Sequence, residues 1–119
     1  MSSKENFSER TPSNPLEKRV VFAEKVIDIN YQLFTKMQEL YAQYVGEEIS
    51  TKKARIEIEK VLTAIMVLTE EVSFSVVEIQ EFEAVREPAT HIGVQKMRAR
   101  TLHTKLARGL HTMSAEDFF

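Results

Sequence analysis

The chain has 119 residues, of which 43% are hydrophobic and 29% are charged, and its formal net charge is −2. This composition excludes an intrinsically disordered chain, and the small net charge gives no general argument for binding nucleic acid or an anionic membrane. The absence of cysteine excludes disulfides, thiolate metal sites and cysteine nucleophiles, and it fits a reducing, cytoplasmic location. Because only three glycines and three prolines interrupt the chain, the sequence predicts an all-α protein of a few long helices.

The chain opens with a polar segment, residues 1–13, which we expect to be a disordered arm because it has no apolar periodicity and no stretch of signal-peptide length. The first helix is predicted to begin at Asn14 and Pro15, an N-cap residue followed by a proline suited to the first helical position. Gly46 is predicted to end this helix by adopting a positive φ. Apolar residues recur along it at steps of four and three, which predicts a buried seam of Leu16, Val20, Ala23, Ile27, Asn30, Phe34, Met37, Tyr41 and Tyr44.

A second helix is predicted from Ser50 or Thr51, either of which can cap it, to Pro88. Residues 72–77 (VSFSVV) alternate and are rich in β-branched residues, so a strand is a competing prediction, but the helical spacing continues through them. At roughly 36 residues this helix would be about 54 Å long. Its predicted seam consists of Ala54, Ile58, Val61, Ile65, Leu68, Val72, Ser75, Ile79 and Phe82.

The third helix is predicted to start at Pro88 or Thr90, and Gly109 is a candidate for its end. Its apolar residues form one narrow stripe, typical of a peripheral helix: Ile92, Ala99, Leu102, Leu106, Leu110 and Met113. Residues 114–119 join two acids to Phe118 and Phe119. We expect a flexible tail, and the alternative is a tail that docks into an apolar pocket with a basic rim.

Together these elements predict an antiparallel bundle of three helices over residues 14–113, with a long hairpin formed by the first two helices. The short third helix would leave part of the second one uncovered, so we expect a homodimer with a four-helix core. Asn30 lies within the first seam among apolar neighbours, where a polar residue can specify register and oligomeric state. An alternative for Asn30 is a position at the rim of the seam.

Charge is uneven along the chain. The third helix carries four outward-facing basic residues, Arg98, Arg100, Lys105 and Arg108, whereas residues 70–87 contain six Glu and one Arg. One interpretation pairs these cations with Glu70, Glu78 and Glu81 of the second helix. The other interpretation is a basic binding surface for an acidic partner or for phosphates. No aromatic residue is interleaved among the cations to stack a base, which disfavours nucleic acid.

Motifs for catalysis and metal binding are not found in the sequence. The three histidines, His91, His103 and His111, are twelve and eight residues apart, whereas a helical metal pair needs a spacing of three or four. No phosphate loop, dinucleotide fingerprint or nucleophile elbow occurs. We therefore predict no catalytic residue, no metal and no cofactor, and no segment is apolar enough for a membrane partner.

The function predicted from these observations is a non-enzymatic helical protein-interaction module, such as an adaptor, chaperone or regulator, that acts through its bundle face or its C-terminal tail. The alternatives are a nucleic-acid-associated factor and an enzyme with a site inside the bundle. The predicted partner is a protein. The candidate partner-binding residues are Arg98, Arg100, Lys105, Arg108, Phe118 and Phe119.

Overall fold

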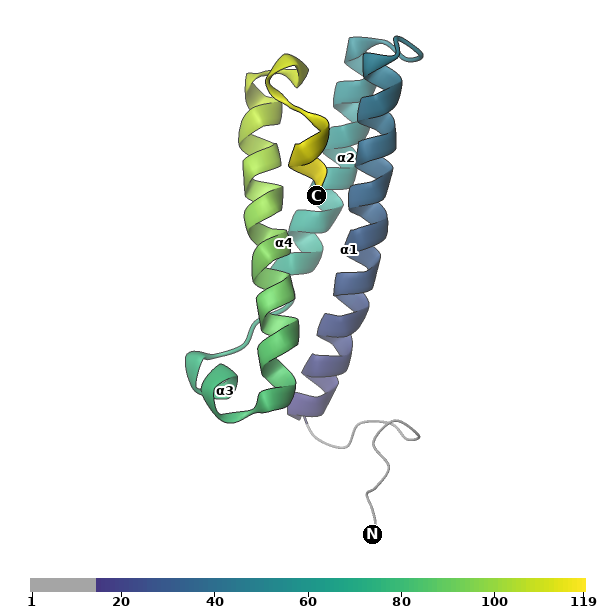
Figure 1. The fold of residues 1–119 in the computed structure, drawn as a ribbon. Coiled ribbons are helices and arrows are strands. Elements are labelled where there is room, and N and C mark those ends of the chain that lie inside the picture. The colour runs from purple at the N-terminus through teal and green to yellow at the C-terminus, as the bar shows by residue number, and fades with distance from the viewer. Residues whose placement is uncertain (1–14) are drawn as a thin grey trace.

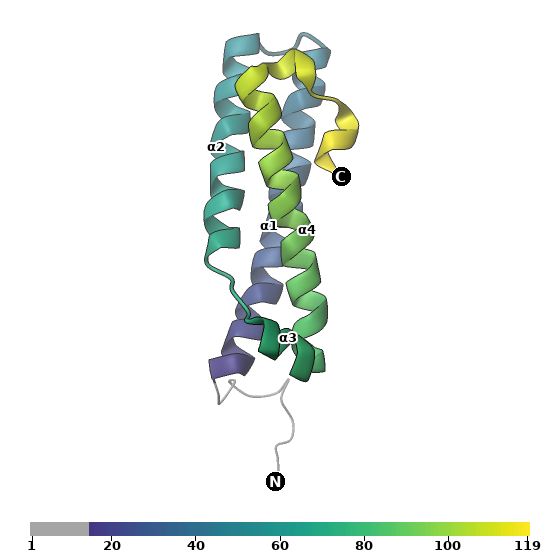
Figure 2. The same cartoon turned by 90° about the vertical axis from the view of Figure 1, so that its left-hand side faces the viewer.

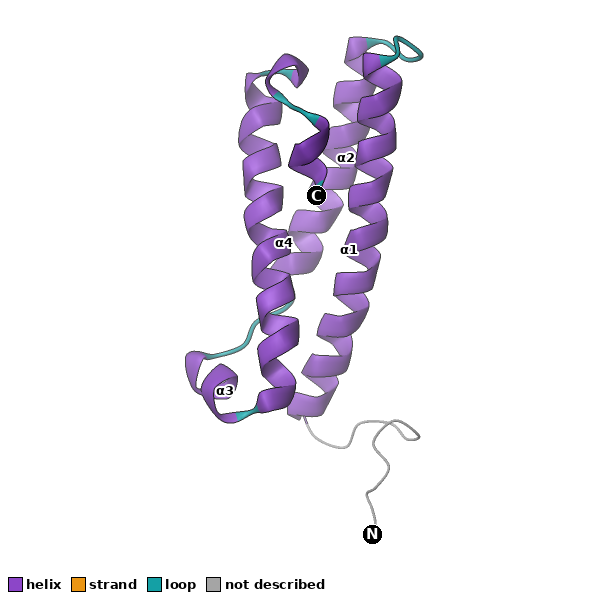
Figure 3. Cartoon of the chain, in the orientation of Figure 1, coloured by secondary structure: helices purple, strands orange, loops and turns teal. Residues whose placement is uncertain are grey.

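The computed structural model describes residues 15–119 and confirms the all-α bundle. Three long helices run up, down and up, and a short helix crosses the lower end of the bundle (Figures 1–3). The described part measures 59 × 27 × 19 Å. Its elements are α1 (Pro15–Val45), α2 (Thr51–Glu70), α3 (Val76–Glu81), α4 (Glu83–Arg108) and the 3₁₀ turns η2 (Leu110–Thr112) and η3 (Ala115–Phe118). The predicted arm and the predicted cap Asn14 lie outside the described residues.

The hairpin between α1 and α2 is confirmed, with one correction at its turn. The residue with positive φ is Glu47 (φ 59°) and not Gly46. The Glu47 amide donates to the Tyr44 carbonyl at 3.1 Å and the Glu48 amide to the Gln43 carbonyl at 2.8 Å, which together form a Schellman motif one residue beyond the predicted one. Ser50 caps α2 as predicted, accepting a hydrogen bond from the Lys53 amide at 3.0 Å.

The predicted continuous second helix is wrong, because α2 ends at Glu70 after 20 residues. The following segment is neither the predicted helix nor the alternative strand: residues 72–75 are an irregular connection whose Val72 is buried. Ser75 and Glu78 then form a capping box that starts α3. Since α2 is short and α4 has 26 residues, the length argument for a homodimer no longer holds.

Pro88 also differs from its predicted role as a helix boundary. It is buried inside α4, which begins five residues earlier at Glu83. Arg86 joins the two neighbouring helices, because its guanidinium donates to the carbonyls of Ile79 at 3.0 Å and Gln80 at 2.6 Å. These contacts satisfy carbonyls at the end of α3, where the helix itself supplies no partner.

The core consists of two clusters of buried side chains. The larger cluster lies where α1, α2 and α4 pack together, and it includes Met37, Ile58, Ile65 and Leu102. The smaller one lies below the end of α2, where Val72 of the connection packs against Ala23, Val26, Ile27 and Ile92. The connection thus covers the part of α1 that the predicted long helix was expected to cover.

The predicted seams are confirmed in part. The predicted stripe of the third helix is buried, with Ile92, Ala99, Leu102 and Leu106 on α4 and with Leu110 and Met113 beyond its end. On α2 the fully buried residues include Leu62 and Thr69, whereas Val61 and Leu68 of the predicted seam are only half-buried. The buried face of α2 is therefore rotated by part of a turn from the one that the spacing predicts.

One ion pair ties the beginning of α1 to α3. Arg19 donates to both carboxylate oxygens of Glu78, with 3.0 Å between its Nη1 and Oε1, and its guanidinium lies 5.5 Å from the centre of the Phe74 ring. The hydrogen bond from Arg19, followed by the one from the Ser75 amide, lowers the pKa of Glu78 from 4.5 to about 2.

This lowered pKa predicts a pH-dependent contribution to stability. A carboxylate with a lower pKa in the folded state stabilises the fold fully above its unfolded pKa, and the contribution is lost as the pH falls from about 4.5 to about 2. We expect Glu78→Gln to melt below the wild type at neutral pH and the difference to vanish near pH 2. Melting curves of both proteins at several pH values test this, and a difference independent of pH would contradict it.

Candidate functional site

The C-terminal segment packs against the bundle, so the prediction of a free tail is corrected. It folds back between the upper parts of α4 and α1 (Figure 1). Phe118 is 3% exposed and belongs to the larger core cluster, with its ring centre 5.4 Å from that of Tyr41. Phe119 is 63% exposed. The apolar burial of Phe118 offsets part of the entropy lost by ordering this short segment.

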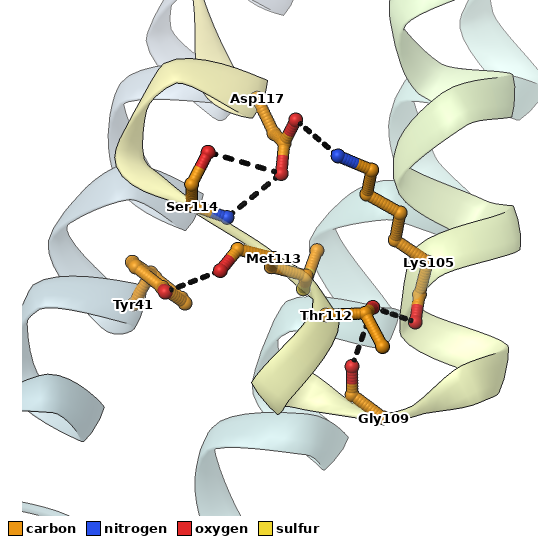
Figure 4. Close-up of polar contacts among 7 residues, drawn as sticks. All are labelled: Tyr41, Lys105, Gly109, Thr112, Met113, Ser114 and Asp117. Atoms are coloured by element: carbon orange, nitrogen blue, oxygen red, sulfur yellow. Dashed lines mark hydrogen bonds and ion pairs between the residues drawn. The ribbon is translucent and has the colours of Figure 1, made fainter.

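Polar contacts hold the same segment in place (Figure 4). Gly109, with φ 125°, ends α4 as predicted, and the Thr112 hydroxyl donates to the Lys105 carbonyl at 2.9 Å. The Tyr41 hydroxyl donates to the Met113 carbonyl at 2.6 Å. Lys105 Nζ donates to Asp117 Oδ1 at 2.8 Å.

Asp117 is the acid that anchors the tail. Burial raises its pKa, but the hydrogen bond from Lys105 and the one from the Ser114 amide outweigh burial, so the pKa of Asp117 lies below its usual value. Asp117 is therefore a charged partner of Lys105 at neutral pH. The alternative prediction of an acidic and aromatic tail in an apolar pocket with a basic rim matches this arrangement, with the pocket supplied by the same chain.

Below the tail, α1 and α4 form the walls of an apolar groove with a volume of about 500 Å³. The wall from α1 consists of Tyr31, Phe34, Thr35 and Gln38, and the wall from α4 of Thr90, His91, Val94, Gln95 and Arg98. Phe118 and Phe119 close its upper end. Four residues of each wall recur at i, i+3, i+4 and i+7, because each helix exposes one flank to the groove, and Thr90 is a fifth residue of the α4 wall.

Most of the residues in the two walls carry a polar group, and Thr35, Gln38 and Thr90 are among them. The Tyr31 hydroxyl lies 3.4 Å from His91 Nδ1 across the opening between the helices. Gln95 lies on its floor and is buried. Arg98 lies at the border of the groove and of a second depression that also contains Val94, Met97 and Asp117. Concavities that combine apolar surface with convergent polar groups are typical of binding sites.

A larger depression, about 730 Å³, lies at the turn between α1 and α2 and is lined by Tyr44, Val45 and the residues from Glu47 to Thr51. Its lining contains two acids and a polar turn, and it has no wall formed by packed helices. We therefore regard the α1–α4 groove as the candidate functional site.

The four predicted basic residues do not form one surface. Arg98 borders the groove and Lys105 is paired with Asp117, whereas Arg100 and Arg108 are exposed. Arg98 and Arg100 lie about 200° apart around the helix axis. The predicted pairing with acids of the second helix is also wrong for Glu78, whose partner is Arg19 of α1. Within residues 15–119, neither Glu70 nor Glu81 forms an ion pair with α4.

Asn30 is fully buried, which excludes the rim position, and its partner is in the same chain. Its side-chain Nδ2 donates to Gln95 Oε1 at 2.9 Å, and Gln95 Nε2 donates to the Ile27 carbonyl at 3.1 Å. Asn30 Oδ1 has no hydrogen-bond partner among the described residues. This amide pair joins α1 to α4 within one chain, and a role of Asn30 in specifying the oligomeric state stays a prediction.

The pair of amides gives a direct test of this assignment. Gln95→Leu leaves the Asn30 amide buried without a partner and is expected to lower the free energy of unfolding by about 1–3 kcal/mol. The double variant Asn30→Leu with Gln95→Leu removes both polar groups and should recover most of that loss. Urea unfolding of the single and double variants measures the difference. Equal destabilisation by both would show that the amide pair contributes no specific interaction.

Sequence reasoning missed the groove, including the meeting of Tyr31 with His91. The signal was present as the equal spacing of residues 31, 34, 35 and 38 and of residues 91, 94, 95 and 98. It becomes informative only once α1 and α4 are known to lie side by side, because each set by itself looks like the ordinary flank of a buried stripe.

Residues 15–119 contain no group of three or more His, Cys, Asp or Glu side chains arranged to hold a metal ion. No helix in the same range combines the length and apolar character needed to cross a membrane.

Comparisons with models of known protein families, with curated proteins and with solved structures found no match to this chain. Its function is therefore inferred from the groove and its residues.

Proposed function

We propose that this protein is a non-enzymatic helical interaction module that binds a protein partner in the α1–α4 groove. The observation that carries this proposal is the apolar groove itself, which stays open although the chain has a C-terminal segment packed directly above it. Helical grooves of this kind receive apolar side chains at spacings of three and four residues.

The rim of the groove supports a macromolecular partner. Tyr31, Val94, Met97 and Phe119 are large apolar side chains, each at least half exposed, and the last three border the adjoining depression. Exposed apolar residues that gather around a concavity mark interaction sites more often than residues scattered singly. Tyrosine and methionine are also enriched at the centres of protein interfaces.

The two alternative functions have less support. Nucleic-acid binding would need several cations on one surface, but Lys105 is neutralised by Asp117 and Arg100 faces away from Arg98. An enzyme would need a positioned acid–base pair or nucleophile. The groove contributes only the half-exposed His91 with Tyr31 at a long distance of 3.4 Å.

Photo-crosslinking tests the proposal. A photoreactive amino acid in place of Val94 should crosslink a protein in extracts of the native cell, and the same amino acid in place of Val67 should not. Val67 is the matched control because it is 55% exposed, close to Val94 at 50%, but lies on α2 away from the groove. The same crosslinked proteins from both positions, or none from Val94, would contradict the proposal.

A homodimer is a separate proposal with a new basis. Phe22 and Ile29 are exposed on one side of α1, seven residues apart, and a second copy would cover them. We expect sedimentation equilibrium at micromolar concentration to give the mass of two chains, and Phe22→Ser with Ile29→Ser to give the mass of one. A single-chain mass for the wild type would contradict this prediction.

The cytoplasmic location likewise remains a proposal, based on the cysteine-free sequence.

A further inference from the structure

We propose that the α1–α4 groove recognises a partner segment in which a carboxylate side chain is adjacent to an aromatic one, and that Arg98 binds the carboxylate. This inference rests on the proposed function, because it assigns the chemistry of the protein partner that the groove receives. The chain's own tail occupies the neighbouring part of the same surface and shows the chemistry that this surface binds.

The tail shows how an acid and the next aromatic residue engage this side of the bundle. Asp117 forms a 2.8 Å ion pair with Lys105 of α4, while Phe118 inserts its ring beside Tyr41 of α1. The acid thus binds a cation of one helix and the ring packs on the other helix. An Asp–Phe dipeptide is sufficient for this pair of contacts.

The same combination of groups recurs two helical turns earlier. Arg98 precedes Lys105 by seven residues, which places it about 10 Å along α4 on the same side of the helix. Across from Arg98, the wall from α1 offers Tyr31 and Phe34, as it offers Tyr41 to Phe118. The groove therefore continues the tail's own binding surface beyond Phe119, with the cation and the apolar wall both repeated.

Arg98 differs from Lys105 in having no counter-ion within residues 15–119. It is half-buried beside apolar side chains, where a guanidinium gains most from a bidentate carboxylate. The groove lining contains no Asp or Glu, and Asp117 at its border already accepts hydrogen bonds from Lys105 and Ser114. Asp117 also lines the depression beside Arg98, but it is already paired with Lys105, so we assign the carboxylate for Arg98 to a ligand.

Fluorescence polarisation with the full chain tests this assignment. The ligand to use is a C-terminally amidated peptide with the sequence of residues 114–119 and fluorescein at its N-terminus, so that only side-chain acids are present. We expect Arg98→Gln to weaken its binding roughly tenfold or more. Arg100→Gln is the matched control on the opposite side of α4 and should leave the affinity unchanged.

Changes in the peptide give a second measurement that does not depend on folding of the variants. Replacing its acids by the corresponding amides, or its two phenylalanines by alanine, should each abolish measurable binding to the wild-type chain. Equal affinity for the amide peptide would overturn the proposal. So would weakening by Lys105→Gln but not by Arg98→Gln, because the peptide would then be replacing the tail.

A binding measurement with laurate, a fatty-acid carboxylate, distinguishes a lipid-like ligand of the groove from a protein segment. Binding of laurate that depends on Arg98, without binding of the peptide, would overturn the assignment of a protein segment. If the peptide fails to bind but position 94 still crosslinks a protein, only the chemistry assigned to the partner is wrong. If the peptide binds through Arg98 and no protein crosslinks at position 94, the proposed function itself fails.

Discussion

Ile65→Asp is expected to unfold the protein. Ile65 has no exposed surface and packs in the larger core cluster with Ile58, Leu62 and Leu102. A carboxylate there would have no partner, and burying it costs several kcal/mol, comparable with the roughly 5–15 kcal/mol by which a domain of this kind is stable. Circular dichroism of the purified variant should show the loss of most helical signal and of the cooperative melting transition.

The matched control for this variant is Val67→Asp, two residues further along α2. Val67 is 55% exposed, so the same carboxylate stays hydrated and the melting temperature should change by only about a few degrees. The contrast isolates burial from helix propensity, because both substitutions place an aspartate inside α2. If Val67→Asp unfolds and Ile65→Asp does not, the buried face of α2 is assigned to the wrong side.

The elements that the sequence predicts well are those specified by neighbouring residues. Ser50 caps α2, Gly109 ends α4, and the stripe from Ile92 to Met113 is buried, since each depends on local hydrogen bonding or on the helical repeat. The turn after α1 shows the limit of this approach. A Schellman motif forms there with Glu47 in the left-handed position, although the adjacent Gly46 would adopt it at lower cost.

Two kinds of interaction, one local and one tertiary, explain the break between α2 and α3. The Ser75–Glu78 capping box is a local signal for a helix start, and it outweighs the heptad spacing that continues through residues 72–82. The burial of Val72 against Ala23 and Ile27 is a tertiary contact, which no spacing within residues 70–90 can reveal. Pro88 is similar, because a proline near the start of a helix and a proline at its first position look alike in sequence.

Part of the candidate site could be found from composition alone. Lys105, Arg98, Phe118 and Phe119 were singled out by charge and by the acidic, aromatic tail, and all four border the groove or the docked tail. Their arrangement could not be predicted, because the sequence does not show whether a cation on α4 pairs with an acid of residues 70–87 or with Asp117. Only the packing of α4 against α1 decides that Asp117 is the partner of Lys105.

Phe118→Ala is expected to lower the free energy of unfolding by roughly 3–5 kcal/mol, the usual cost of truncating a fully buried phenylalanine. The ring is 3% exposed, contacts Tyr41 and closes the upper end of the groove, so its removal leaves a cavity between α1 and α4. Urea unfolding should show the loss as a lower midpoint. Phe119→Ala is the matched control, because the neighbouring ring is 63% exposed and its loss should change the midpoint little.

The same pair of variants tests whether the docked tail is a structural part of the groove. With Phe118 removed, Asp117 keeps its partly buried ion pair with Lys105, but one such pair contributes roughly 1 kcal/mol, which is too little to hold six residues in place. Hydrogen exchange should therefore become fast for the hydrogen-bonded amides of Ser114, Asp117 and Phe119 in Phe118→Ala, and it should remain unchanged for the first two in Phe119→Ala. Fast exchange of these amides in the wild type would contradict the docked tail, and the groove would then extend along α4 as far as Lys105.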